Sequence, residues 1–150
     1  MIKIYIFADS HKHFSEAIWE YVKRLWKQVD IRELKPIKKG NPEQIISAET
    51  ELLREKLEKE SGYKIVLSPA WKNISTEEVS VMIQKQKNRG KKIIFAIGGA
   101  HGLDYSALKD SIDEELSLGK MTLPHSLALT ILLEQVYRCS EIEKGSKYHK

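Results

Sequence analysis

A run of five apolar residues, Ile93 to Ile97, constrains the fold more than any other segment. A strand that is apolar throughout has both faces covered, as strands inside a parallel sheet do. Gly98, Gly99 and Gly102 follow it, so a buried strand leads directly into a glycine-rich loop. Glycine has no Cβ, so its backbone can take positive φ values and approach a ligand closely. We therefore predict a ligand pocket at the end of this strand.

Predicted strands and helices alternate along the rest of the chain. Apolar runs and apolar-charged alternation indicate the strands, and helical spacing of apolar residues indicates the helices. Asn41 followed by proline, and the S-x-x-E pattern that begins at Ser75, are typical helix starts. The strands are expected at 2–8, 29–34, 63–67 and 92–97, and the helices at 14–25, 41–59, 75–90 and 124–142, with a short helical piece at 104–109 and an extended piece around Leu116. This order predicts an α/β fold with a mostly parallel sheet flanked by helices on both faces.

Length and composition limit the class of protein. A chain of 150 residues with 41% hydrophobic content suits one domain, spanning residues 1–150. No stretch reaches the roughly 18 apolar residues of a membrane span, and Asp9 interrupts the apolar opening run, so we expect a soluble cytoplasmic protein without a membrane partner. Cys139, the single cysteine, lies in an apolar helical pattern typical of a buried thiol. The formal charge of +4 is too small to establish nucleic-acid binding by itself.

Four blocks in the last third carry a family resemblance. They are IGGAHGL, LSLGKMTLPH, LLEQVYR and the terminal YHK, in that order. On these blocks the chain resembles the ribosomal RNA large subunit methyltransferase H family, densely from Ile93 to Lys150 and thinly before Lys64. The resemblance implies a SPOUT-type fold with a C-terminal trefoil knot, an exception to the rule against threaded chains. It also implies S-adenosylmethionine as cofactor, and methylation of N3 of a pseudouridine in large-subunit ribosomal RNA, free or in the assembled ribosome.

The resemblance assigns a cofactor site around the glycine-rich loop. The residues it implies are Leu67, Gly98, Gly99, Leu118, Gly119, Lys120, Met121, Thr122 and Leu123. The chemistry agrees, because an adenine ring needs apolar walls and main-chain groups at its polar edge. The chain departs from common family patterns at Ala8-Asp9, at Ser68-Pro69 and at Gly119.

The resemblance also implies catalytic roles for Arg138, Tyr148, His149 and Lys150. Methyl transfer needs an aligned acceptor, and N3 of pseudouridine must lose a proton. His149 could accept that proton or a hydrogen bond, Tyr148 could orient or stack on the base, and Arg138 and Lys150 could hold phosphate or polarise the ring carbonyls. From the residues alone, Arg138 also suits an ion pair with Glu134, and a terminal triplet suits a frayed end.

A homodimer is expected, with the tail of one subunit completing the site of the other. The family resemblance implies this arrangement, and the final helix supports association independently. Its apolar residues spread around most of the circumference, more than packing on a sheet requires. They are Leu127, Leu129, Ile131, Leu132, Leu133 and Val136.

Two other classes of function stay open. Asp9-Ser10-His11 after an apolar strand is similar to the first metal motif of binuclear metallophosphoesterases, but the later motifs of that class are missing and no metal site is expected. The second alternative is a non-catalytic SPOUT module that binds RNA or cofactor without turnover, because a fold does not guarantee an activity.

Overall fold

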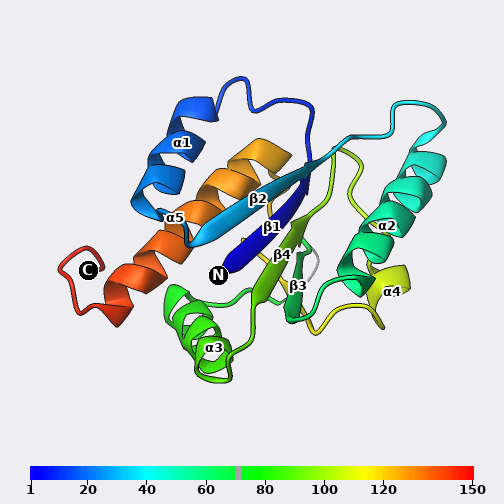
Figure 1. Cartoon of the computed structure of the whole chain (residues 1–150). Helices are drawn as coiled ribbons and strands as arrows, with labels where there is room; N and C mark the ends of the chain where they lie inside the picture. Colours follow the sequence, from blue (N-terminus) through cyan, green and yellow to red (C-terminus); the bar gives the residue numbers. More distant parts are fainter. Residues whose placement is uncertain (70–71) are drawn as a thin grey trace.

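A five-stranded sheet forms the centre of the computed structural model, which describes residues 1–69 and 72–150. Figure 1 shows the sheet between helices on either side. The strands are β1 (Ile2–Phe7), β2 (Val29–Leu34), β3 (Tyr63–Leu67), β4 (Ile93–Ile97) and β5 (Glu114–Leu116). Their order is β2-β1-β4-β3-β5, and each neighbouring pair is parallel. The predicted α/β fold is confirmed, and the extended piece around Leu116 is an edge strand of the sheet.

Helices cover both faces of the sheet, as predicted. They are α1 (Ser15–Arg24), α2 (Pro42–Glu58), α3 (Thr76–Asn88), α4 (Tyr105–Leu108) and α5 (His125–Glu143). Apolar side chains of α1, α3 and α5 pack in one core cluster, and those of α2 and α4 pack in a second cluster on the opposite face. Both predicted helix starts are capping boxes, in which Asn41 and Gln44, and Ser75 and Glu78, satisfy each other's backbone N–H groups.

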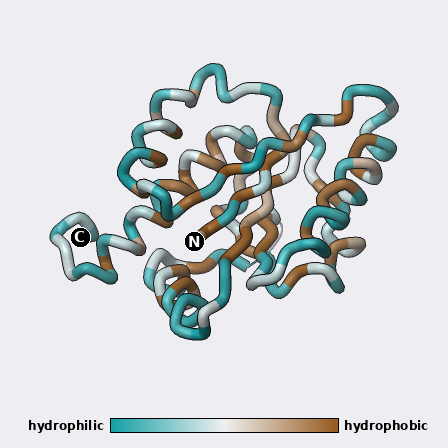
Figure 2. Tube along the Cα trace, in the orientation of Figure 1, coloured by the Kyte–Doolittle hydropathy of each residue, from teal (hydrophilic) through white to brown (hydrophobic). Residues whose placement is uncertain are grey.

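Strand β4 joins the two cores. All five of its residues are buried, with Ile93, Phe95 and Ile97 in one cluster and Ile94 and Ala96 in the other. Alternate residues of a strand point to opposite faces, so a strand between two helical layers must be apolar throughout. Figure 2 shows the same distribution, with hydrophobic segments along the central strands and hydrophilic ones on the outer turns. Nowhere in the described ranges is a helix both long and apolar enough to cross a membrane.

A polar cluster centred on Glu60 ties β1 to the start of β4. The Glu60 carboxylate accepts hydrogen bonds from Tyr5 Oη at 2.7 Å and from Lys92 Nζ at 3.0 Å, and it also pairs with Lys3. Burial alone would raise the pKa of Glu60, but the bonds from Lys3, Tyr5 and Lys92 outweigh it and hold the pKa at about 2. Burial, followed by the hydrogen bond to the same carboxylate, raises the pKa of Tyr5 to about 12.

Glu60→Gln should therefore destabilise the fold in a pH-dependent way. A carboxyl group whose pKa falls from 4.5 to about 2 on folding contributes stability above pH 4.5 and loses it as the pH drops toward 2. We expect the variant to lose about 1–2 kcal/mol of unfolding free energy at pH 7, because water screens part of the interaction. Its stability should also fall less steeply than that of the wild type between these pH values. Urea unfolding across this range tests this, with the exposed Glu58→Gln as control; equal slopes for wild type and Glu60→Gln would contradict it.

Candidate functional site

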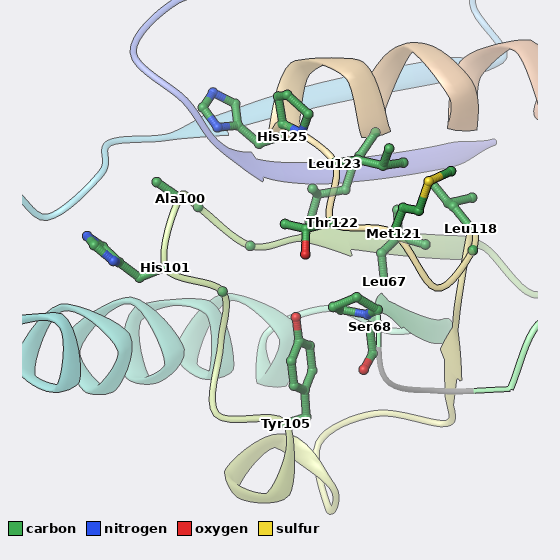
Figure 3. A pocket seen from close by; sticks show the side chains of 18 residues that line it. Leu67, Ser68, Ala100, His101, Tyr105, Leu118, Met121, Thr122, Leu123 and His125 are labelled. Atoms are coloured by element: carbon green, nitrogen blue, oxygen red, sulfur yellow. The ribbon is translucent and has the colours of Figure 1, made fainter.

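A pocket of about 770 Å³ lies at the carboxyl ends of β3 and β4 (Figure 3). Open α/β sheets bind ligands at this edge, and the volume falls within the usual range for small-molecule sites. Residues 67–69, 97–102, 105, 118, 119, 121–125 and 128 line it. The pocket therefore lies where the glycine-rich loop predicted it, between that loop, the start of α5 and the segment that precedes α5.

Eight of the nine predicted cofactor residues line this one pocket. They are Leu67, Gly98, Gly99, Leu118, Gly119, Met121, Thr122 and Leu123. Lys120 is exposed and is not part of the lining. Met121 is 79% exposed and belongs to the pocket lining. An apolar ring placed against Met121 and Leu118 would remove that surface from water.

Close packing requires glycine at Gly98 and Gly99. A Cβ on Gly98 would lie 2.9 Å from Leu103 Cγ, and a Cβ on Gly99 would lie 2.7 Å from Glu49 Oε2. Positive φ angles occur instead at Gly102 (76°) and at Gly119 (147°). A side chain at Gly99 would thus point toward Glu49. Gly98 and Gly99 line the pocket with main-chain atoms only. The sequence had suggested that the ligand itself excludes a side chain here.

Polar side chains absent from the predicted site also line the pocket. His101 and His125 flank it at one end, and the hydroxyl of Tyr105 points across it toward Thr122 (Figure 3). Burial, followed by the nearby His11, lowers the pKa of His125, so its imidazole is neutral near pH 7. Burial also raises the pKa of Tyr105, which keeps its hydroxyl protonated. His101 and His125 could have been predicted as pocket residues, because both lie in the sequence blocks that carry the family resemblance. No pattern in the sequence indicated Tyr105.

Three of the four predicted catalytic residues meet at the other end of α5. Arg138 Nε donates to Glu134 Oε1 at 2.9 Å, and its Cζ lies 4.8 Å from the ring centroid of Tyr148. Arg138 Nη1 lies 3.4 Å from His149 Nδ1, and His149 Nε2 lies 2.9 Å from Glu77 Oε1. Lys150 is exposed at the chain end. The ion pair expected from the spacing of Glu134 and Arg138 is therefore present beside the tail contacts.

The tail is packed against α5 and is not frayed. The Tyr148 ring meets Tyr137 edge to face at 4.9 Å, and its hydroxyl donates to Glu134 Oε1 at 3.2 Å. Burial, with contributions from Tyr21 and Glu134, raises the pKa of Tyr148 to about 12. Its hydroxyl therefore stays protonated and acts as a hydrogen-bond donor.

The tail lies far from the pocket of its own chain. His125 at the start of α5 lines the pocket, and Arg138 follows about 20 Å further along the helix, at about 1.5 Å per residue. Figure 1 shows the C-terminus beyond the far end of α5. The fold thus separates the predicted cofactor residues from the predicted catalytic residues within the chain.

The metal-like motif after β1 has other partners. Asp9 pairs with Lys38 at 2.7 Å, and His11 contacts Ser126 Oγ at 2.7 Å and Glu33 Oε1 at 3.0 Å. Over residues 1–69 and 72–150, no three His, Cys, Asp or Glu side chains gather as a metal site would require. The His11 contacts instead connect the segment after β1 to the start of α5.

A parallel sheet with an apolar, glycine-lined pocket at its carboxyl edge defines an α/β protein with a candidate small-molecule site. The structure of a probable methylase family protein from Haemophilus influenzae Rd KW20 has a similar fold, with a TM-score of 0.62 and 12% identity over 99% of this chain and 70% of that chain. The family described as "Predicted SPOUT methyltransferase" matches residues 1–149. This chain belongs to that SPOUT methyltransferase family.

Two relatives named "Ribosomal RNA large subunit methyltransferase H" are similar over almost the whole chain. The protein from Bacillus thuringiensis (strain Al Hakam) is 41% identical over 149 residues, covering 93% of this chain and 92% of the relative. The protein from Caldicellulosiruptor saccharolyticus is 34% identical, and the alignment covers both chains completely. The similarity therefore includes the first half of the chain, where the sequence motifs gave only a weak resemblance.

Proposed function

We propose that this chain transfers a methyl group from S-adenosylmethionine to N3 of a pseudouridine in large-subunit ribosomal RNA. The convergence of eight predicted cofactor residues on one pocket carries the proposal. The names of the two relatives point to ribosomal RNA of the large subunit as substrate. An enzyme with this substrate would work in the cytoplasm.

The pocket residues suit an adenosyl cofactor. Leu118, Met121 and Leu123 offer apolar walls for an adenine ring, and Gly98 and Gly99 leave their main-chain groups accessible. Ser117 holds the loop in shape, because its hydroxyl donates to Gly119 O and accepts from Gly119 N. When bound, S-adenosylmethionine supplies an electrophilic methyl group on its sulfonium sulfur.

The tail residues would act on the RNA base. Tyr148 would donate a hydrogen bond or stack on the base, and His149 would accept the N3 proton or orient the base. Arg138, held in place by Glu134, would polarise a ring carbonyl, and the exposed Lys150 would contact phosphate. Because these residues lie about 20 Å along α5 from their own pocket, we propose that they serve the pocket of a second subunit in a homodimer.

The surface of α5 available to such a dimer is smaller than its sequence indicates. Leu129, Leu132, Leu133 and Val136 are buried in the core of the single chain. Leu127 and Ile131 are half-buried, and their spacing puts them on one stripe with Glu134 and Arg138. This stripe leads from the pocket end of α5 to the tail.

Ile131→Glu should therefore weaken dimerisation and leave the subunit folded, because the introduced charge would lose its water in the contact. Leu129 is 0% exposed, so Leu129→Glu should unfold the chain instead. Sedimentation at micromolar concentration, with circular dichroism for folding, separates the two effects. A wild-type protein that sediments as a monomer, or an Ile131→Glu dimer of wild-type affinity, would contradict the assignment.

A methyl-transfer assay tests the proposed activity. Purified protein would receive S-adenosylmethionine with a radioactive methyl group, and either assembled ribosomes that lack the modification or the free RNA. We expect radioactivity in large-subunit RNA, and the better substrate shows which form the enzyme recognises. Cofactor binding without transfer to either substrate would instead favour the non-catalytic module.

A further inference from the structure

Glu49 is a buried carboxylate that the sequence analysis did not assign. It lies on the apolar stripe of α2 formed by Ile45, Glu49, Leu53 and Leu57, and it is only 2% exposed. Its Oε1 accepts a hydrogen bond from Ile37 N at 3.2 Å. Its Oε2 has no hydrogen-bond partner within the part of the chain that the structure describes. Burying a carboxylate with an unsatisfied oxygen is costly, so a purely structural role explains this residue poorly.

The unsatisfied oxygen lies directly behind the cofactor pocket. The Cβ position of Gly99 is 2.7 Å from Oε2 and 3.3 Å from Oε1, and Gly99 lines the pocket. A single layer of main chain therefore separates the carboxylate from the pocket. Burial, the largest effect, raises the pKa of Glu49, and the hydrogen bond from Ile37 N–H and the more distant His101 on the glycine loop oppose this rise.

We propose that Glu49 is a positioning residue whose negative charge, acting through the glycine loop, favours a cofactor with a cationic sulfur over its neutral thioether product. The proposal rests on the proposed function, in which S-adenosylmethionine is the methyl donor. Donor and product differ at the sulfur alone: the donor is a sulfonium cation, and S-adenosylhomocysteine is an uncharged thioether. A nearby negative charge therefore distinguishes the two, whereas apolar walls and main-chain contacts bind both alike.

Across residues 1–69 and 72–150, Glu49 forms no salt bridge, and this makes the discrimination effective. A carboxylate already paired with lysine or arginine directs most of its field to that partner. Among the described residues, the Ile37 N–H is the only hydrogen-bond donor to Glu49, so the field of the carboxylate extends to the loop and the pocket. A cation in the pocket would in turn favour the ionised form of Glu49, because opposite charges stabilise each other across a poorly solvated wall. The consequence is tight binding of the methyl donor and easier release of the product.

Isothermal titration calorimetry of S-adenosylmethionine and S-adenosylhomocysteine tests the proposal. Glu49→Gln removes the charge and retains an oxygen that can accept from Ile37 N–H. The control is Glu51→Gln on the same helix, where the side chain is 53% exposed and pairs with Arg54. We expect Glu49→Gln to bind the donor about 5-fold to 10-fold more weakly and the product within about 2-fold of wild type, as for charges separated by a protein layer. Glu51→Gln should change neither affinity.

The stability of the variant provides a second readout. Replacing a buried, poorly satisfied carboxylate with a neutral amide should leave the melting temperature equal to or above that of the wild type, as at other functional sites. Glu49→Met, of similar length and without polar side-chain atoms, repeats the binding test should the glutamine variant fold poorly. The proposal would be overturned if Glu49→Gln lost the same affinity for donor and product, or lost no affinity for the donor. Wild-type protein that binds neither ligand would instead refute the proposed function on which it rests.

Discussion

Removal of Tyr148, His149 and Lys150 is expected to lower methyl transfer by about 100-fold to 10,000-fold, the usual contribution of a positioned acid or base. Cofactor affinity should change little, because the tail lies about 20 Å along α5 from the pocket of its own chain. The melting temperature should fall by only a few degrees, since the tail contacts are partly exposed. Single-turnover methyl transfer, calorimetry and thermal unfolding of the protein truncated after Lys147 provide the three measurements.

Controls separate catalysis from charge in this experiment. Lys147→Gln removes an exposed tail charge outside the predicted set and should transfer methyl groups at nearly the wild-type rate. His149→Gln and Tyr148→Phe divide the loss between proton transfer and hydrogen bonding. A truncated protein that methylates at the wild-type rate would show that the tail has no catalytic role.

Gly99→Val should weaken cofactor binding by about 100-fold or more. Its Cβ would lie 2.7 Å from Glu49 Oε2, closer than any real contact, and valine adds two further methyl groups. Glu49 is buried, so either its side chain or the loop must shift to relieve the clash, and a shift of the loop would deform the pocket that Gly99 lines. Calorimetry with S-adenosylmethionine measures the loss, and circular dichroism confirms that the variant is folded.

A double variant tests whether the clash is the cause. Glu49→Ala removes the carboxylate that the valine would meet, so Gly99→Val with Glu49→Ala should recover part of the lost affinity. A folded Gly99→Val protein with wild-type affinity would show that the loop does not form the cofactor site.

Local patterns predicted the framework of the fold well. Ile93 to Ile97 predicted a strand covered on both faces, and the capping residues Asn41 and Ser75 predicted where two helices begin. These features depend on neighbours within a few residues, so one sequence is sufficient to find them. The cofactor loops came from the family resemblance, and the structure shows only that they share a pocket.

Features that depend on distant neighbours were not predictable in this way. Glu49 falls on the apolar stripe between Ile45 and Leu53, a signal visible in the sequence, but its position behind Gly99 follows from packing between α2 and the loop. The sequence pattern predicted Leu129 as an interface residue. In the structure Leu129 lies in the core, because α5 packs against α1, α3 and the sheet. The trefoil knot stays a prediction from family resemblance, because periodicity carries no information about threading.

Mass mapping of nucleosides in large-subunit ribosomal RNA tests the central claim most directly. RNA from cells that lack the gene would be compared with RNA from the parent and from cells complemented with the wild-type or the truncated protein. We predict that deletion removes one methylated pseudouridine and restores the unmethylated form at that position, and that only the wild-type gene reverses the change. An unchanged set of methylated nucleosides in the deletion strain, or a loss confined to small-subunit RNA, would contradict the proposed function.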